Sequence, residues 1–151
     1  IMRNYYIMDS YGFVLLNSGS YAAAIDVFHE IFNIENVRYP RILGWLGAAY
    51  ARSGQTQEAR QILEELVELQ KINNAGSPCF FAAVVHSALG NTDEALLFIR
   101  KSIDKHEMEV PWLISEPQFF ELHDHPDFGN MVEEVGFPGR AYGKEFRKVV
   151  S

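Results

Sequence analysis

The feature that most constrains this chain is a turn that recurs three times at a nearly constant interval. Glycines stand at positions 19, 54 and 90, so the interval is 35 and then 36 residues, and an alanine follows each glycine five residues later. Apolar residues spaced three and four apart flank each turn, which indicates a helix on either side. Self-similarity at this interval is typical of stacked helical hairpins that bury their apolar faces against one another. The sequence therefore predicts an all-α fold, an α–α superhelix of three helical hairpins.

Each turn is expected to end one helix and to begin the next. A glycine at the C-terminus of a helix adopts the left-handed conformation that a residue with a Cβ resists. Thr56 and Thr92 follow their glycines by two residues and are expected to cap the second helix of each hairpin. Ala24, Ala59 and Ala95 fall where the two helices of a hairpin must approach closely, so their recurrence indicates a packing requirement.

These small and aromatic positions resemble the tetratricopeptide repeat. The matching positions are Gly12, Gly19, Ala24 and Phe28 in the first unit, and Leu43, Leu46, Gly47, Tyr50, Gly54 and Ala59 in the second. The third unit departs from the family pattern, because Ala83 and His86 replace its usual glycine and large aromatic residue. The resemblance covers about residues 5–107 and places the hairpins at about 5–36, 40–71 and 76–107. It implies a solenoid that binds a protein or peptide partner and does not catalyse a reaction.

The C-terminal part of the chain departs from the repeat pattern. Prolines that end helices and many aromatic residues occur together in 110–128, which predicts a buried, largely helical cap over 110–151 within one domain, 1–151. The runs 117–122, 126–128 and 131–138 look like the closing segment of repeat arrays in bacterial transcriptional regulators and adenylate-cyclase-like signalling proteins. This likeness implies an alternative function, the regulatory or sensor arm of a larger bacterial protein.

A tetratricopeptide array presents a groove that is lined mainly by the first helix of each hairpin. The side chains expected there are Phe13, Asn17, Arg41, Trp45, Arg52, Phe80, Phe81 and Val84. Aromatic residues and arginine supply much of the binding energy at interfaces, so Trp45, Phe80 and Phe81 would anchor a peptide, and Arg41 and Arg52 would contact its acidic groups. In the alternative interpretation, the aromatic side chains pack between repeats or against a C-terminal segment that folds back into the groove.

Neither a cofactor nor catalysis is predicted. His123 and His125 lie beside carboxylates and are weak candidates for zinc ligands, but a polar turn in which Asp124 caps the next helix is the preferred interpretation. The sequence contains no glycine-rich phosphate loop, nucleophile turn or paired-cysteine motif. Together with an open repeat fold, this argues against an enzyme.

Charge and composition limit the partners. The 13 Lys and Arg against 20 Asp and Glu give a net charge of −7, which disfavours direct binding of nucleic acid. No apolar run approaches the roughly 20 residues that span a bilayer. The single cysteine, Cys79, cannot form an internal disulfide, so we expect a cytoplasmic protein without a membrane partner.

The two ends of the sequence lead to two further expectations. The chain begins with Ile, and helical patterning starts almost at once, which favours a piece of a larger protein. Residues 138–151 are rich in basic side chains and form either a loose tail or a short helix. As a helix, Phe146, Val149 and Val150 would dock on a second copy and give a homodimer.

Overall fold

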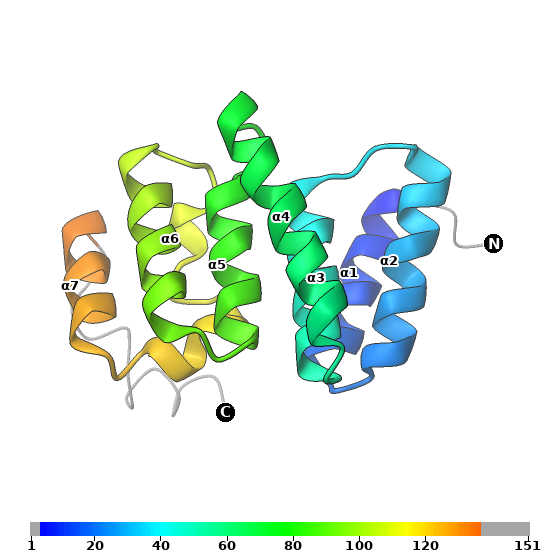
Figure 1. Ribbon diagram of the computed structural model, residues 1–151, viewed down its shortest axis with the longest axis horizontal. Coiled ribbons are helices and arrows are strands. Elements are labelled where there is room, and N and C mark those ends of the chain that lie inside the picture. Colours follow the sequence, from blue (N-terminus) through cyan, green and yellow to red (C-terminus); the bar gives the residue numbers. More distant parts are fainter. Residues whose placement is uncertain (1–3, 137–151) are drawn as a thin grey trace.

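The computed structural model describes residues 4–136, and this part of the chain is helical without strands (Figure 1). The elements in chain order are α1 (Tyr5–Asn17), α2 (Tyr21–Glu35), α3 (Pro40–Arg52), α4 (Thr56–Ile72), α5 (Pro78–Ala88), α6 (Thr92–Asp104), the 3₁₀ segments η1 (Val110–Trp112) and η2 (Pro117–Leu122), and α7 (Pro126–Val135). The first six helices form three successive hairpins. The prediction of an all-α, tetratricopeptide-like superhelix is therefore confirmed.

The hairpins stack side by side in two layers. The first helices α1, α3 and α5 contact one another in sequence, while α2, α4 and α6 pair with them from the other side. Figure 1 shows this order running from α1 and α2 at one end of the molecule to α7 beyond α6 at the other. Each hairpin thus buries one face against the next, as the repeat interval requires.

The three turns have the geometry that their glycines predict. Gly19, Gly54 and Gly90 have φ angles of +83°, +82° and +78°, in the left-handed region. The recurrent alanines that follow them are fully buried between the helices of their hairpins. The predicted threonine caps are wrong, because Thr56 and Thr92 are already the first helical residues and the preceding residue occupies each N-cap position without a side-chain cap bond.

Close packing of α3 on α5 fixes the inner layer. A Cβ added to Gly44 would lie 2.6 Å from the Cβ of Phe81, and one added to Gly47 would lie 2.6 Å from a methyl group of Val85. Glycine at these positions lets the two helices approach closely, since distances this short do not occur between real carbon atoms. Trp45 and Phe81 are thereby brought to neighbouring places on the same face.

The segment after α6 was expected to close the last repeat, and only part of it does so. The helix α7 packs on α6, where Arg100 pairs with Glu134 at 2.7 Å. The preceding η2 packs on α5 instead, where Ser87 Oγ donates to the carbonyl of Gln118 at 2.6 Å. The C-terminal segment thus also covers part of the inner layer.

A buried carboxylate attaches this segment to the start of α5. The amides of Cys79 and Phe80 donate to the two carboxylate oxygens of Glu107 at 3.0 and 2.8 Å. The first amides of a helix have no partner within the helix, and the N-terminus favours negative charge. Glu107 therefore caps a helix that begins 29 residues before it, with Pro78.

The start of α7 differs by one residue from the sequence prediction. His125, and not Asp124, is the N-cap, and its Nδ1 accepts from the amide of Asp127 at 3.2 Å. Pro126 occupies the first helical position, which fixes the residue immediately before it as the cap. The homodimer helix with Phe146, Val149 and Val150 lies outside the described residues.

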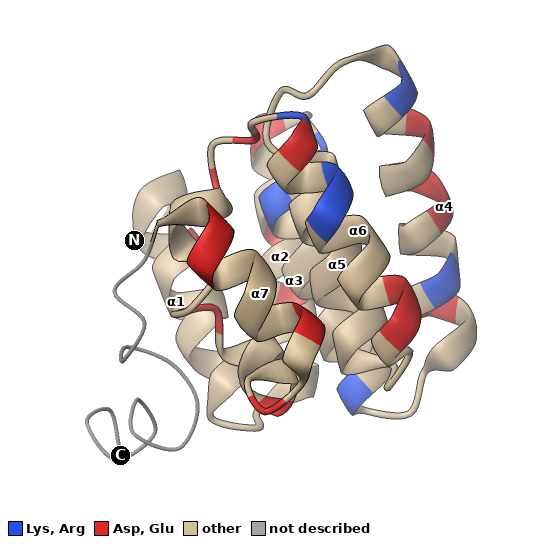
Figure 2. Cartoon of the chain, turned by 90° about the vertical axis from the view of Figure 1, so that its left-hand side faces the viewer, with Lys and Arg blue, Asp and Glu red and all other residues tan. Residues whose placement is uncertain are grey.

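The surface of the helices is mixed in charge. Figure 2 shows both acidic and basic positions along α4. Among the helices that the structure describes, none combines the length and apolar character needed to cross a membrane.

Candidate binding pocket

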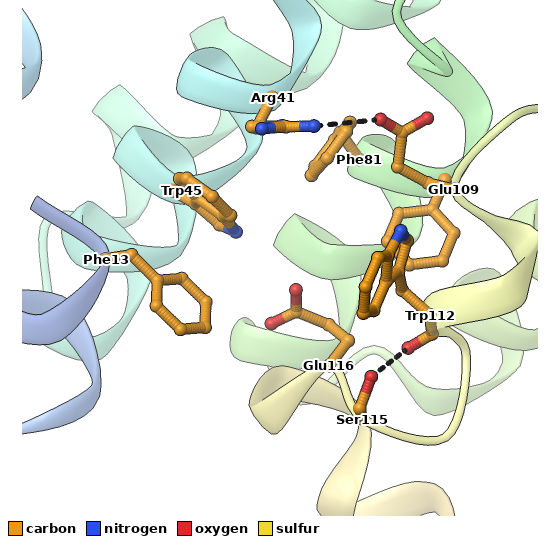
Figure 3. Close-up of a pocket in the computed structure, with 9 residues that line it drawn as sticks. Phe13, Arg41, Trp45, Phe81, Glu109, Trp112, Ser115 and Glu116 are labelled. Atoms are coloured by element: carbon orange, nitrogen blue, oxygen red, sulfur yellow. Dashed lines mark hydrogen bonds and ion pairs between the residues drawn. The ribbon is translucent and has the colours of Figure 1, made fainter. Parts of the chain in front are cut away.

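The inner layer and the segment after α6 line a pocket of about 230 Å³ that is open to solvent. Its lining residues come from α1, α3, α5 and the stretch 109–116, and they are Phe13, Arg41, Trp45, Phe80, Phe81, Glu109, Trp112, Ser115 and Glu116. Figure 3 shows Phe13 and Trp45 on one side, Trp112 on the opposite side, and the carboxyl group of Glu116 between them.

Aromatic rings form most of the walls. The centroids of Phe13 and Trp45 are 4.8 Å apart, and Phe81 meets Trp45 edge-on at 6.2 Å. Trp112 is 62% exposed, whereas Phe81 is almost completely buried. The pocket therefore has one solvent-exposed wall and one wall that belongs to the hydrophobic core. These are the only two tryptophans of the chain, and both line the pocket.

The arginine at the rim is already shared between two carboxylates. Arg41 lies 3.4 Å from an oxygen of Asp9 and 3.4 Å from an oxygen of Glu109. Glu109 also accepts a hydrogen bond from Ser77 Oγ. Burial raises the pKa of Asp9 above its ordinary value, although the charge of Arg41 and its hydrogen bond act in the opposite direction. An incoming anion would have to compete with both carboxylates for this guanidinium.

Glu116 is a buried acid that faces the pocket. Glu116 is only 6% exposed, and one of its carboxylate oxygens accepts a hydrogen bond from the backbone amide of Gln118 at 3.1 Å. Burial raises the pKa of Glu116 to about 7, against the opposing effects of the Gln118 amide and the Trp45 indole. The indole N–H of Trp45 points toward this carboxyl group in Figure 3, and it has no direct hydrogen-bond partner within residues 4–136.

Three of the residues expected in the groove contact residues 118–121 of the C-terminal segment. Asn17 accepts from the Gln118 side-chain amide at 3.1 Å, and Arg52 donates to Gln118 and to Glu121, each at 3.1 Å. The ring of Phe80 lies 5.3 Å from that of Phe119. The contact of Phe80 with Phe119 is of the kind expected in the alternative interpretation, in which aromatic side chains pack against a C-terminal segment that folds back into the groove.

Val84 is fully buried and offers no surface to a ligand. Five of the expected residues come together around the pocket, Phe13, Arg41, Trp45, Phe80 and Phe81, and Phe80 also contacts Phe119. The structure thus divides the expected groove into a filled half and an open half.

The histidines of the last segment do not converge. The ring of His123 is buried and stacks on Phe128 with centroids 5.0 Å apart, while His125 caps α7. The part of the chain that the structure describes contains no group of three or more His, Cys, Asp or Glu side chains arranged to hold a metal ion. Burial, followed by the charge of Glu107, raises the pKa of the Cys79 thiol to about 11, so this cysteine is not an activated nucleophile.

Sequence reasoning did not find the opposite wall of the pocket. Glu109, Trp112, Ser115 and Glu116 all lie outside the repeats, so repeat periodicity assigns them no place. The density of aromatic residues in 110–128 predicted that this stretch would be buried, and the alternative interpretation placed a C-terminal segment in the groove, but neither identified these four residues as pocket lining.

The fold and the pocket define a helical repeat protein whose inner face is partly filled by its own C-terminal segment. Residues 15–71 match the tetratricopeptide repeat family, a stretch that reaches from the end of α1 almost to the end of α4. No curated protein and no solved structure matches the chain. Tetratricopeptide repeats generally mediate protein–protein interactions and are typically non-catalytic. The resemblance of the C-terminal segment to regulator and cyclase-like arrays stays a prediction.

Proposed function

We propose that this protein is a non-catalytic interaction module that holds a segment of a partner protein in the pocket between α1, α3, α5 and residues 109–116. The observation that carries this proposal is an open pocket whose aromatic walls come from both the repeats and the closing segment, residues 107–136. Aromatic side chains in a concave site supply large contact areas at a small cost in conformational entropy. The match of residues 15–71 to a family of interaction repeats supports it.

The binding surface in this proposal is smaller than the groove that the sequence predicts. Phe13, Trp45 and Phe81 contact the ligand together with Trp112, while Asn17, Arg52 and Phe80 hold the closing segment in place and Val84 stays buried. The ligand is a protein or peptide, and neither nucleic acid nor a membrane is a direct partner. The mixed charges along α4 and the net charge of −7 fit this choice. The cytoplasmic location stays a prediction.

Partner capture with matched variants tests the proposal. The wild-type chain, Trp45→Ala, Trp112→Ala and the control Leu97→Ala are used as bait in lysate of the source cells. Leu97 is an exposed apolar residue of α6 away from the pocket. We expect the control to keep the partner and the tryptophan variants to lose affinity by roughly 30-fold, a typical effect for a central aromatic residue. A partner kept equally by all four proteins would contradict the assignment to the pocket.

A second candidate is the regulatory arm of a larger bacterial regulator or signalling enzyme. Ile7, Tyr11 and Val14 are exposed apolar residues at positions i, i+4 and i+7, so they share one face of α1. Such a face suits contact with another domain. The length of the natural reading frame tests this candidate: several hundred residues before Met2 would support it, and a start at or just before Met2 would exclude it.

A further inference from the structure

We infer that the pocket takes a cationic side chain, the ammonium group of a lysine or the guanidinium group of an arginine, from the segment that the protein binds; this inference rests on the proposed function. It reverses the expectation drawn from the two arginines of the groove, which favoured an acidic ligand. The reversal follows from the charges and rings that the fold places around the pocket.

The charged groups at the pocket are mostly acidic. Arg41 is the only basic side chain among the described residues that line it, and Asp9 and Glu109 each lie 3.4 Å from its guanidinium. Glu116 is the second carboxyl group of the lining beside Glu109, and it has no basic partner within the described residues at salt-bridge distance. A cation entering the pocket therefore meets an acid without a salt-bridge partner, while an anion meets two carboxyl groups and an arginine that already pairs with Asp9 and Glu109.

The aromatic walls also suit a cation. A positive group is attracted to the face of an aromatic ring within about 6 Å of its centroid, most strongly for tryptophan. The guanidinium of Arg41 already lies over the ring of Trp45, 5.8 Å from its centroid, so this ring already makes one contact of this kind. Trp112 stands on the opposite side of the pocket and is largely exposed, which leaves its surface to the ligand (Figure 3). The methylene groups of a lysine or arginine would pack along the two indole rings.

Glu116 gives the bound cation a partner at the base of the pocket. Its carboxyl group lies between Phe13, Trp45 and Trp112 in Figure 3, and it is held there by the Gln118 amide. Because burial keeps the pKa of this acid near 7, a bound cation would shift it toward the ionised form and release a proton. The indole N–H of Trp45 faces the same carboxyl group and favours that ionised form.

The charged groups near Glu116 determine how the affinity for a cationic ligand depends on pH. Arg41 on α3 and Glu109 before η1 are the other charged groups that line the pocket with Glu116, and Asp9 on α1 pairs with Arg41, while α5 contributes only Phe80 and Phe81 to the pocket. A cationic ligand then binds more tightly as the pH rises through about 7. An anionic ligand would bind more tightly as the pH falls, and an uncharged apolar ligand would show little change.

Selection of short random peptides by display on the full chain tests the inference. Enriched peptides are synthesised in three forms that carry the original residue, norleucine or glutamate at each basic position. Binding is followed by tryptophan fluorescence, which reports on this pocket because Trp45 and Trp112 are the only tryptophans. We expect basic residues to be enriched, and their replacement by norleucine to weaken binding at least about tenfold.

Variants of the protein provide the second measurement. We expect Glu116→Gln to weaken binding of the basic peptide and to abolish its strengthening between about pH 6 and pH 8, whereas Leu97→Ala leaves both unchanged. Glu116→Gln keeps an oxygen that can accept from the Gln118 amide, so the loop stays capped. Circular dichroism and thermal unfolding of both variants confirm their fold.

The remaining outcomes separate this inference from the proposed function. Enriched peptides that require Trp45 and Trp112 but bind equally well with norleucine or glutamate would overturn the cation site and leave the interaction pocket standing. Failure to enrich any peptide that depends on the two tryptophans would overturn both. Binding that emerges only after Arg140, Lys144, Arg147 and Lys148 are replaced by glutamine would assign the pocket to the chain's own C-terminal residues and overturn the inference of a partner side chain.

Discussion

The second hairpin and residues 109–116 form opposite walls of one pocket, and different kinds of contact hold their side chains in place. In the hairpin, Trp45 is placed by helical periodicity and by the close approach of α3 to α5 at Gly44. In the segment, Trp112 ends the short 3₁₀ segment η1 and Glu116 is the N-cap of η2, so helical periodicity does not place them and their position depends on contacts with other parts of the chain. The comparison teaches that the repeats provide a regular frame, while an irregular segment provides the charge that gives the pocket its chemistry.

The two regions also differ in how they satisfy their polar groups. The repeats bond internally along each helix, and their turns need only a left-handed glycine. The closing segment contributes two buried carboxylates that cap helical turns, Glu107 on α5 and Glu116 on η2. Removing a buried partner costs more than removing an exposed one, so the closing segment depends on a few specific side chains.

The largest expected effect is the loss of stability when one buried phenylalanine in each region is replaced by alanine. Phe28 in the first hairpin and Phe119 in η2 are both fully buried. If the closing segment is part of a single folding unit, Phe119→Ala and Phe28→Ala should each lower the free energy of unfolding by about 3–5 kcal/mol. Urea unfolding followed by far-ultraviolet circular dichroism and by tryptophan fluorescence should give coincident transitions for both variants. Separate transitions in Phe119→Ala would contradict the prediction of one domain.

A smaller effect is expected where the two regions are joined. Glu107→Ala leaves the amides of Cys79 and Phe80 without their carboxylate and should lower the free energy of unfolding by about 2–3 kcal/mol. Glu107→Gln keeps an acceptor oxygen but loses the negative charge, so about half of this loss is expected. Denaturant unfolding measures both variants against Glu64→Ala on the exposed face of α4. Equal stabilities for all three variants would show that this cap does not join the regions.

The smallest of the three effects concerns pH. The pKa of Glu116 is about 7 in the folded chain and about 4.5 as its ordinary value, so the folded state binds this proton more tightly than the unfolded state. That stabilisation is present at acid pH and is lost as the pH rises through about 7. From about pH 5 to pH 8, we expect the free energy of unfolding to fall by about 1–3 kcal/mol more in the wild type than in Glu116→Gln.

Subtracting the pH profile of Glu116→Gln from that of the wild type gives the contribution of Glu116 to the free energy of unfolding, without the contributions of other titrating groups. The raised pKa of Asp9 acts in the same direction, while burial lowers the pKa of His86 and so reduces stability as the pH falls below its ordinary value of 6.5. Both groups are present in each protein and cancel in the comparison. Parallel pH profiles for the wild type and Glu116→Gln would contradict the raised pKa.

Particular residues show how far the sequence carried the prediction of the site. Phe13, Arg41, Trp45 and Phe81 line one pocket, because helical spacing and the order of the hairpins determine which residues share the inner layer. Whether they bind a ligand stays a prediction. The expected role of Arg41 and Arg52 as anion contacts took no account of Asp9, Glu109, Gln118 and Glu121, which come from other elements and occupy both guanidinium groups.

The sequence by itself determined the helical hairpins, their turns and their buried alanines. These features depend on contacts between residues close in the chain and on a repeated pattern of size, which local chemistry specifies. Only the tertiary structure decided which half of the groove is filled and which charges surround the open half. Those outcomes depend on contacts such as that of Asn17 with Gln118, 101 residues apart, where the burial of a group and its partners are set by the whole fold.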